Sequence, residues 1–138
     1  MSQRKVLVDT DVCLDLLTGR KPFNQSAELL FSLGDAGKIR LYVSAISFSN
    51  LDYILRKELI SGRKSRAILS QLEAVVTVLP VGEKTIQGAL RSDFNDFEDA
   101  IQHQVALENG QSVLITRNLK DYRKANCLIM SPEMFLAN

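Results

Sequence analysis

Short polar and acidic side chains follow two apolar runs of this chain. Asp9 and Asp11 come directly after the run 6–8, and the polar segment TRNLKD at 116–121 follows the run 112–115. Runs of this length and composition are typical of strands that are buried on both faces of a parallel sheet. Open α/β sheets bind their ligands at the carboxyl ends of such strands. We therefore expect both polar groups to contribute to a functional site, although Asp9 could also simply cap a helix.

A third acidic group, DFNDFED at 93–99, precedes a predicted helix and contains four carboxylates in seven residues. Capping explains part of it, because Asp96 suits an N-cap position and Asp99 would lie in the first helical turn. Capping does not explain four acids, since like charges this close repel each other and raise one another's pKa. A bound divalent cation would remove the repulsion, so the group favours a metal site.

Strands alternate with helices along the chain. The expected strands are 6–8, 39–43, 75–79, 112–115 and 128–130, and the expected helices are 12–17, 24–36, 46–60, 64–73, 83–91, 96–109 and a final turn from Ser131. Period, capping residues and terminal glycines support these boundaries. The alternation is typical of βαβ units, so it predicts a three-layer α/β/α sandwich around a parallel sheet.

The composition is that of an ordinary globular protein, and we expect a single domain over residues 1–138. The chain is 46% hydrophobic and 24% charged, with a formal net charge of +1. Attraction to a polyanion must therefore come from a local patch. No run approaches the ~20 apolar residues of a membrane span. The start MSQRKVLVD leaves no room for a signal peptide, so we expect a cytoplasmic location and no membrane partner.

Several other catalytic patterns find no support in the sequence. Cys13 and Cys127 lack the spacing of metal ligands, and we expect small core residues in a reducing compartment. No Ser/His/Asp set, CxxC pair or glycine-rich phosphate loop is present. His103 shares a helix face with Asp96 and Asp99 but lies one turn further from the strand ends. We expect it to be partly exposed and to have no catalytic role.

Four segments together resemble the PIN-domain family, which includes the VapC-type toxins of toxin–antitoxin systems. They are VLVDTDVCLDLL, VSAISFSNLDYIL, DFEDAIQHQVAL and VLITRNLKDY, in the family's order and over nearly the whole chain. The resemblance implies a five-stranded parallel sheet of order 3-2-1-4-5. In that order the switch point lies between the first and fourth strands, so Asp9 would face residues 116–118.

The resemblance also implies a metal-dependent ribonuclease, in which carboxylates hold Mg²⁺ or Mn²⁺ for the hydrolysis of RNA phosphodiester bonds. Asp9 and Asp99 match the family's first and third acids, while Asn50 stands at the second position, usually a glutamate, and Asn118 at the fourth. The implied metal ligands are Asp9, Asp99 and Asn50. The implied catalytic residues are Asp9, Asp99, Asp96, Asn118 and Asp121.

RNA is the expected substrate, and we expect an antitoxin protein and a homodimer as further partners. Residues expected to contact the substrate are Thr10, Ser44, Thr116, Arg117 and Lys120. Arg117 and Lys120 would line the approach of the RNA phosphates together with Arg123 and Lys124.

Two other functions stay open. Asn50 and Asn118 offer oxygen donors but no charge, which favours a PIN-like module that binds RNA or a protein without cutting. Such a module would keep its RNA affinity in EDTA and cleave nothing. VLVDTDV also fits the DxDxV signature of haloacid-dehalogenase phosphatases, with Asp9 as nucleophile and Asp11 as acid–base. However, the chain lacks the acidic pair after a late strand that those enzymes use for Mg²⁺.

Overall fold

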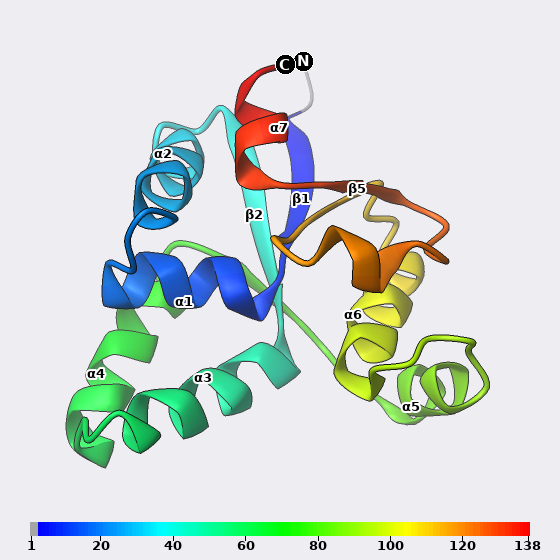
Figure 1. The fold of residues 1–138 in the computed structure, drawn as a ribbon, viewed down its shortest axis with the longest axis horizontal. Coiled ribbons are helices and arrows are strands. Elements are labelled where there is room, and N and C mark those ends of the chain that lie inside the picture. Colours follow the sequence, from blue (N-terminus) through cyan, green and yellow to red (C-terminus); the bar gives the residue numbers. More distant parts are fainter. Residues whose placement is uncertain (1–2) are drawn as a thin grey trace.

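A five-stranded parallel sheet forms the centre of the computed structural model, which describes residues 3–138 (Figure 1). The strands are β1 (Arg4–Val8), β2 (Ile39–Ser44), β3 (Thr77–Leu79), β4 (Val113–Ile115) and β5 (Leu128–Met130). They lie in the order β3-β2-β1-β4-β5, and every neighbouring pair is parallel. The predicted sheet and its order are confirmed.

Helices connect these strands. They are α1 (Thr10–Thr18), α2 (Asn24–Asp35), α3 (Ala45–Lys57), α4 (Gly62–Glu73), α5 (Glu83–Leu90), α6 (Phe97–Glu108) and α7 (Pro132–Leu136), with a short 3₁₀ helix η1 (Leu119–Tyr122). Side-chain caps fix several starts: the Ser61 hydroxyl accepts from the Lys64 amide at 3.2 Å, and Ser131 does the same for α7. Within residues 3–138, no helix combines the length and apolar character that crossing a membrane requires.

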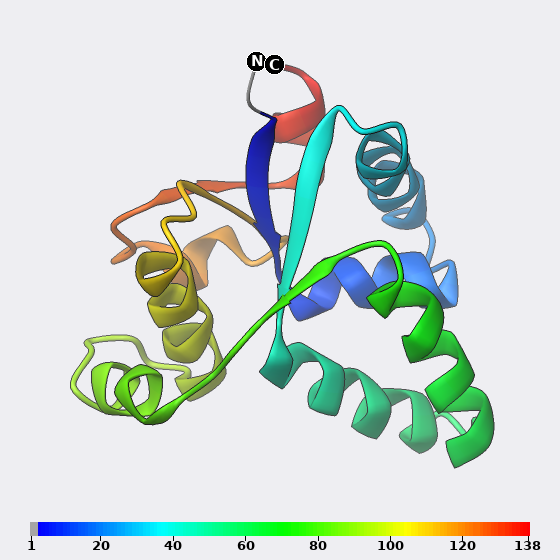
Figure 2. The same cartoon turned by 180° about the vertical axis from the view of Figure 1, so that it is seen from behind.

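Two hydrophobic clusters lie on opposite faces of the sheet. One joins the strands to α1, α2, α3, α4 and α7, and the other joins them to α5, α6 and η1. Along β1, Val6 and Val8 belong to the first cluster and Leu7 to the second, and all three are fully buried. Figures 1 and 2 show α1 to α4 on one side of the sheet and α5 and α6 on the other. The three-layer α/β/α sandwich is therefore confirmed.

A few local expectations are wrong. The helix predicted to reach residue 60 ends at Lys57, and Leu59 is 95% exposed in a turn with φ 67°. The third strand begins at Thr77, after a turn that contains Val75. Cys13 is buried as expected, but Cys127 is only half-buried because it precedes the edge strand β5. None of these differences moves the carboxyl ends of the strands.

Candidate functional site

Asp9 lies where the chain passes from β1 into α1. Its extended backbone and its side chain make it the N-cap of α1, because Oδ1 accepts a 2.8 Å hydrogen bond from the Thr10 amide. Its own amide donates to the Ile115 carbonyl of β4 at 2.9 Å. Asp9 is 4% exposed. Helix capping and strand pairing therefore hold one buried carboxylate at the predicted switch point.

The second oxygen of Asp9 connects it to two other elements. Oδ2 accepts from the Thr116 hydroxyl at 2.9 Å and lies 3.0 Å from the Tyr122 hydroxyl, which also lies 3.2 Å from Oδ1 of Asp99. A phenol carries a single proton and can donate to only one carboxylate at a time. Both contacts are satisfied as hydrogen bonds when one of the two carboxyl groups is protonated.

The electrostatics of Asp9 and Asp99 agree with a shared proton. Burial, followed by the charge of Asp11, raises the pKa of Asp9 to about 8. Burial, followed by the charge of Asp96, raises the pKa of Asp99 to about 7. The metal-free site therefore retains a proton near neutral pH. A bound cation would favour the ionised carboxylates and displace that proton.

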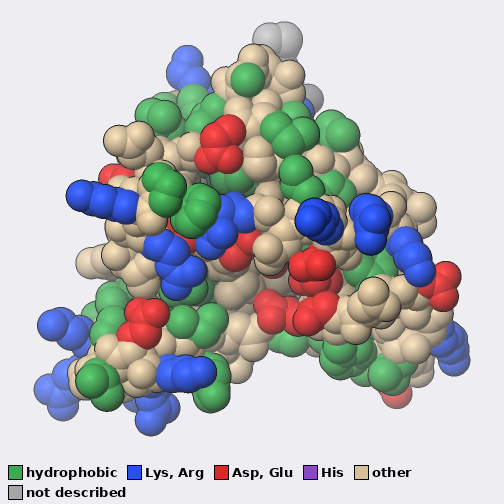
Figure 3. Space-filling model, in the orientation of Figure 1, with side chains coloured by type: hydrophobic (Ala, Val, Ile, Leu, Met, Phe, Trp, Pro, Cys, Tyr) green, Lys and Arg blue, Asp and Glu red, His purple; other side chains and the backbone are tan. Residues whose placement is uncertain are grey.

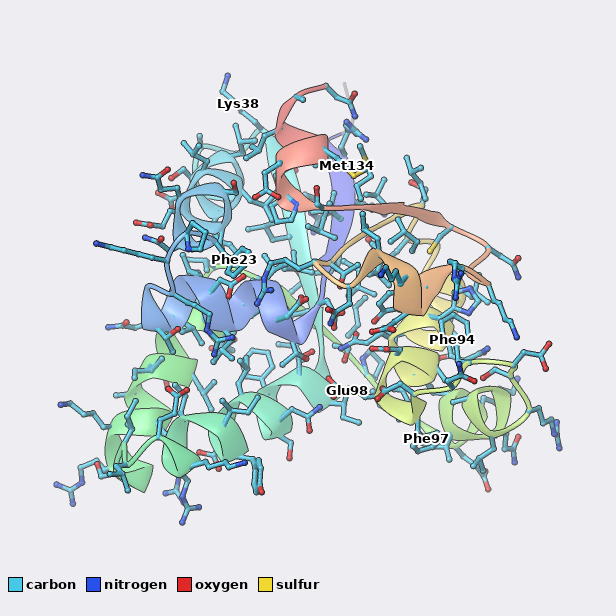
Figure 4. The ribbon with its side chains drawn as sticks, in the orientation of Figure 1. Phe23, Lys38, Phe94, Phe97, Glu98 and Met134 are labelled. Atoms are coloured by element: carbon cyan, nitrogen blue, oxygen red, sulfur yellow. The ribbon has the colours of Figure 1, made fainter. Side chains whose placement is uncertain are left out.

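The start of α6 supplies the remaining acids. Asp96 is the N-cap, and its Oδ1 accepts from the Asp99 amide at 2.9 Å, as predicted from the sequence. This cap places Asp99 in the first turn, where it is 8% exposed. Glu98 lies on the side of α6 that faces α3, and its Oε2 accepts from the Thr10 hydroxyl at 2.9 Å (Figure 4). Phe97, next to Glu98 on α6, points outward and is 46% exposed.

These side chains surround a cavity of about 240 Å³. Its lining comprises Asp9, Thr10, Asp11, Leu14, Ile54, Asp96, Glu98, Asp99, Asn118 and Asp121. Six of the predicted site residues are therefore brought together: Asp9, Thr10, Asp96, Asp99, Asn118 and Asp121. Figure 3 shows a group of acidic side chains at the surface near α6, with lysine and arginine side chains beside it.

Lys120 lies outside this cavity, in an adjoining one of about 280 Å³. Arg123 and Lys124 line the same second cavity, and the two cavities share Asp96 and Asp121. Within residues 3–138, none of these three cationic side chains forms an ion pair. Lys124 Nζ donates to the Asp93 carbonyl at 3.3 Å, and all three side chains are exposed, so they can meet an anion beside the acidic cavity.

Four predicted site residues do not line either cavity: Thr116, Ser44, Asn50 and Arg117. Thr116 is fully buried behind Asp9, donates to it, and accepts a 3.0 Å hydrogen bond from the Asn118 amide. Ser44 is also fully buried, and its hydroxyl has no partner among residues 3–138. Asn50 is half-buried on α3. Contact of Ser44 or Thr116 with a substrate would require their side chains to move.

Arg117 is engaged within the protein. Its Nε and Nη2 bind the two carboxylate oxygens of the buried Asp15 at 2.6 and 3.1 Å. The guanidinium carbon lies 3.9 Å from the centroid of the Phe23 ring, and the Arg117 amide donates to Asp11 at 3.0 Å. Contact with an RNA phosphate would require this ion pair to break. The geometry instead makes Arg117 the link between α1 and the segment after β4.

His103 is buried, so the expectation of a partly exposed histidine is wrong. It is 4% exposed because the Phe94 ring stacks on it, with ring centroids 5.0 Å apart. Its Nε2 accepts from the Asn126 amide at 2.9 Å. Burial lowers the pKa of His103, which favours the neutral imidazole that this hydrogen bond needs. The role of His103 in the fold is to hold the segment before β5.

Sequence reasoning placed Asp11 and Glu98 only within acidic groups expected near the site, and Asp11 as the acid–base of the phosphatase alternative. It gave neither a part in the metal-dependent site and gave Tyr122 no role. Asp11 and Glu98 stand within acidic groups, where spacing alone does not say which acids face the cavity. Tyr122 follows the polar segment after β4, and a tyrosine there gives little signal. Its hydroxyl contacts are visible only when residues 9, 99 and 122 are placed together.

The donor set suits Mg²⁺ or Mn²⁺, since these hard cations prefer oxygen ligands. Within residues 3–138, no three His, Cys, Asp or Glu side chains already form a cage for a metal ion. Mg²⁺ keeps several waters and binds proteins through one or two carboxylates, which Asp9 and Asp99 provide. In addition, Oδ1 of Asp11 is buried without a hydrogen-bond partner in this part of the chain. The residues therefore fit such an ion.

Comparison with known proteins agrees with this description. A family model described as PIN domain matches residues 5–120. The fold is similar to VapBC-1 of nontypeable Haemophilus influenzae (TM-score 0.67, 23% identity, 94% of this chain and 98% of that chain). It is also similar to VapBC2 from Rickettsia felis bound to a promoter DNA fragment (TM-score 0.67, 16% identity, 92% of this chain and 97% of that chain).

A third similar structure is VapC20 of Mycobacterium tuberculosis, a toxin that cleaves the sarcin-ricin loop (TM-score 0.64, 21% identity, 79% of this chain and 86% of that chain). No curated protein has a matching sequence. At these identities the structural similarity shows the fold, and the family match covers most of the chain.

Proposed function

The chain belongs to the PIN-domain family, whose members are typically metal-dependent nucleases, and from this premise we propose that it is an endoribonuclease that uses Mg²⁺ or Mn²⁺. The observation that carries the proposal is the pair of buried carboxylates, Asp9 and Asp99, on either side of the Tyr122 hydroxyl. Within residues 3–138, neither carboxylate forms an ion pair with a lysine or arginine side chain, so both can bind a metal cation. The open cavity in front of it leaves space for a phosphodiester.

Each side chain has a defined part in this proposal. Asp9 and Asp99 would hold the cation, which when bound would polarise the phosphodiester as a Lewis acid and lower the pKa of a water. Tyr122 and Thr116 orient the two carboxylates through the hydrogen bonds described above. Asn118 and Asp121, which line the cavity and are exposed, would position the attacking water or the leaving group. Lys120 binds an RNA phosphate in the adjoining cavity.

We also propose that the chain is the toxin of a toxin–antitoxin pair and forms a homodimer. Its fold is shared with components of VapBC complexes and with a toxin-antitoxin complex from Klebsiella pneumoniae (TM-score 0.66, 22% identity). Growth arrest on expression, relieved by the product of an adjacent small gene, would support the toxin role. Growth unaffected by the folded protein would contradict it. Light scattering of the purified chain measures the homodimer directly.

The test of the enzymatic proposal is cleavage of end-labelled RNA by the purified chain in Mn²⁺, in Mg²⁺ and in EDTA. Hydrolysis by water predicts cleavage with either metal, none in EDTA, and products with 5′-phosphate and 3′-hydroxyl ends. Products with 2′,3′-cyclic phosphate ends that persist in EDTA would contradict the proposal. RNA binding that is equal with and without metal, with no cleavage, would instead identify a binding module.

A further inference from the structure

Glu98 lines the acidic cavity, and a series of hydrogen-bonded side chains holds its carboxylate in place. The Thr10 hydroxyl oxygen lies 2.9 Å from Glu98 Oε2 and 2.8 Å from the Ser47 hydroxyl oxygen. The Ser47 oxygen in turn lies 2.8 Å from Nε2 of Gln102. These contacts connect α1, α3 and α6, and two of the four residues, Thr10 and Glu98, line the cavity. Ser47 and Gln102 are both fully buried.

The carboxylate of Glu98 sets the direction of these three hydrogen bonds. An ionised carboxylate only accepts, so the Thr10 hydroxyl must donate its one proton to Glu98. Thr10 must then accept from the Ser47 hydroxyl, and Ser47 must accept from the Gln102 amide nitrogen. Every hydroxyl proton is committed in one direction. This series of hydrogen bonds therefore ends on the Glu98 carboxylate and fixes it at the cavity wall.

Thr10 brings two carboxylates together. Its amide donates to Asp9 Oδ1 at 2.8 Å, while its hydroxyl donates to Glu98 Oε2. Oε1 of Glu98 takes no hydrogen bond from residues 3–138, so it remains available to a ligand. Asn50, which occupies the position where an acid was expected, is absent from the cavity lining, and Glu98 is present in it. The cavity thus gains from α6 a negative charge that α3 does not supply.

We infer that Glu98 is a third cation-binding carboxylate of this site, acting with Asp9 and Asp99 either directly or through a water on the ion. This inference rests on the proposed metal-dependent function. It assigns Glu98 the charge that Asn50 and Asn118 lack. It also assigns Thr10, Ser47 and Gln102 the role of positioning residues, since they hold Glu98 and do not themselves face the ion as charged groups.

The test is direct Mn²⁺ binding, measured by electron paramagnetic resonance and calorimetry without RNA. Glu98→Gln removes the charge but keeps an oxygen that can accept from Thr10. Glu108→Gln is the matched control, because Glu108 lies on the same helix and its carboxylate also accepts from a threonine hydroxyl, that of Thr85 at 2.7 Å. We expect Glu98→Gln to weaken Mn²⁺ binding about tenfold or more, and Glu108→Gln to leave it within about twofold.

Asp99→Asn, measured alongside, separates this inference from the proposed function. Lost binding in Asp99→Asn with wild-type affinity in Glu98→Gln would overturn the role of Glu98 and leave the metal site standing. Wild-type affinity in both variants would overturn both. Circular dichroism melts must show that each variant is folded. Equal Mn²⁺ affinities of Glu98→Gln and Glu108→Gln in folded proteins contradict the inference in either case.

Discussion

The ion pair between Asp15 and Arg117 predicts a large loss of stability for Asp15→Asn. The Asp15 side chain is 1% exposed and that of Arg117 22%, and two hydrogen bonds join them. Removing one partner of a buried pair costs about 3–5 kcal/mol. Because water reaches part of Arg117, we expect the lower value, about 3 kcal/mol. For 138 residues this corresponds to a fall in Tm of about 10 °C.

The assay is thermal and urea unfolding followed by circular dichroism, since the chain contains no tryptophan. Glu58→Gln is the matched control, because Glu58 pairs with Arg20 at 3.9 Å while both side chains are 40% or more exposed. Exposed pairs contribute about 0–1 kcal/mol, so this variant should melt within about 3 °C of the wild type. Equal melting temperatures for Asp15→Asn and Glu58→Gln would refute the structural role assigned to the Asp15–Arg117 pair.

Three further outcomes are expected. Burial raises the pKa of Asp9 to about 8 and that of Asp99 to about 7, so the folded state keeps protons that the unfolded chain releases above about pH 4. The Tm in EDTA should therefore fall as the pH rises from 5 to 8. A Tm that rises over this range would contradict the burial of these acids. Asn50→Glu should leave the Mn²⁺ affinity measured by calorimetry within about twofold of wild type, because residue 50 does not line the acidic cavity; clearly tighter binding would place residue 50 at the ion. Gly34→Ala should destabilise the protein by about 1–3 kcal/mol in urea melts, since the added Cβ would collide with the Leu41 side chain of β2. Gly62→Ala is the control, because a Cβ at residue 62 has space. Equal unfolding midpoints for the two variants would contradict this.

The fold was predictable because its signals are local. The apolar runs of the strands need burial on both faces, as Val6, Leu7 and Val8 show. Helices separate these strands, and α1, α4, α6 and α7 have side-chain N-caps. Element ends were less predictable, because tertiary packing decides them. The turn at Leu59 lies between α3 and α4 and contains no glycine or proline, so nothing in the local sequence indicates its left-handed conformation.

The candidate site was predictable to the extent that its residues follow strand ends or cap helices. Asp9, Asp96 and Asp99 meet that condition, and the structure places all three at one cavity. Glu98 and Tyr122 could not be assigned from spacing, because their role depends on contacts between residues far apart in the chain. Arg117 shows the opposite case, in which a basic residue near the site binds an internal acid that the sequence does not single out.

The most direct test of the central claim is the Mn²⁺-dependent rate of RNA cleavage by Asp99→Asn, compared with wild type at equal concentrations of folded protein. The account predicts rapid cleavage by the wild type and none above the EDTA background by the variant, because the asparagine removes one of the two buried carboxylates that hold the ion. Wild-type cleavage by a folded Asp99→Asn protein would contradict it.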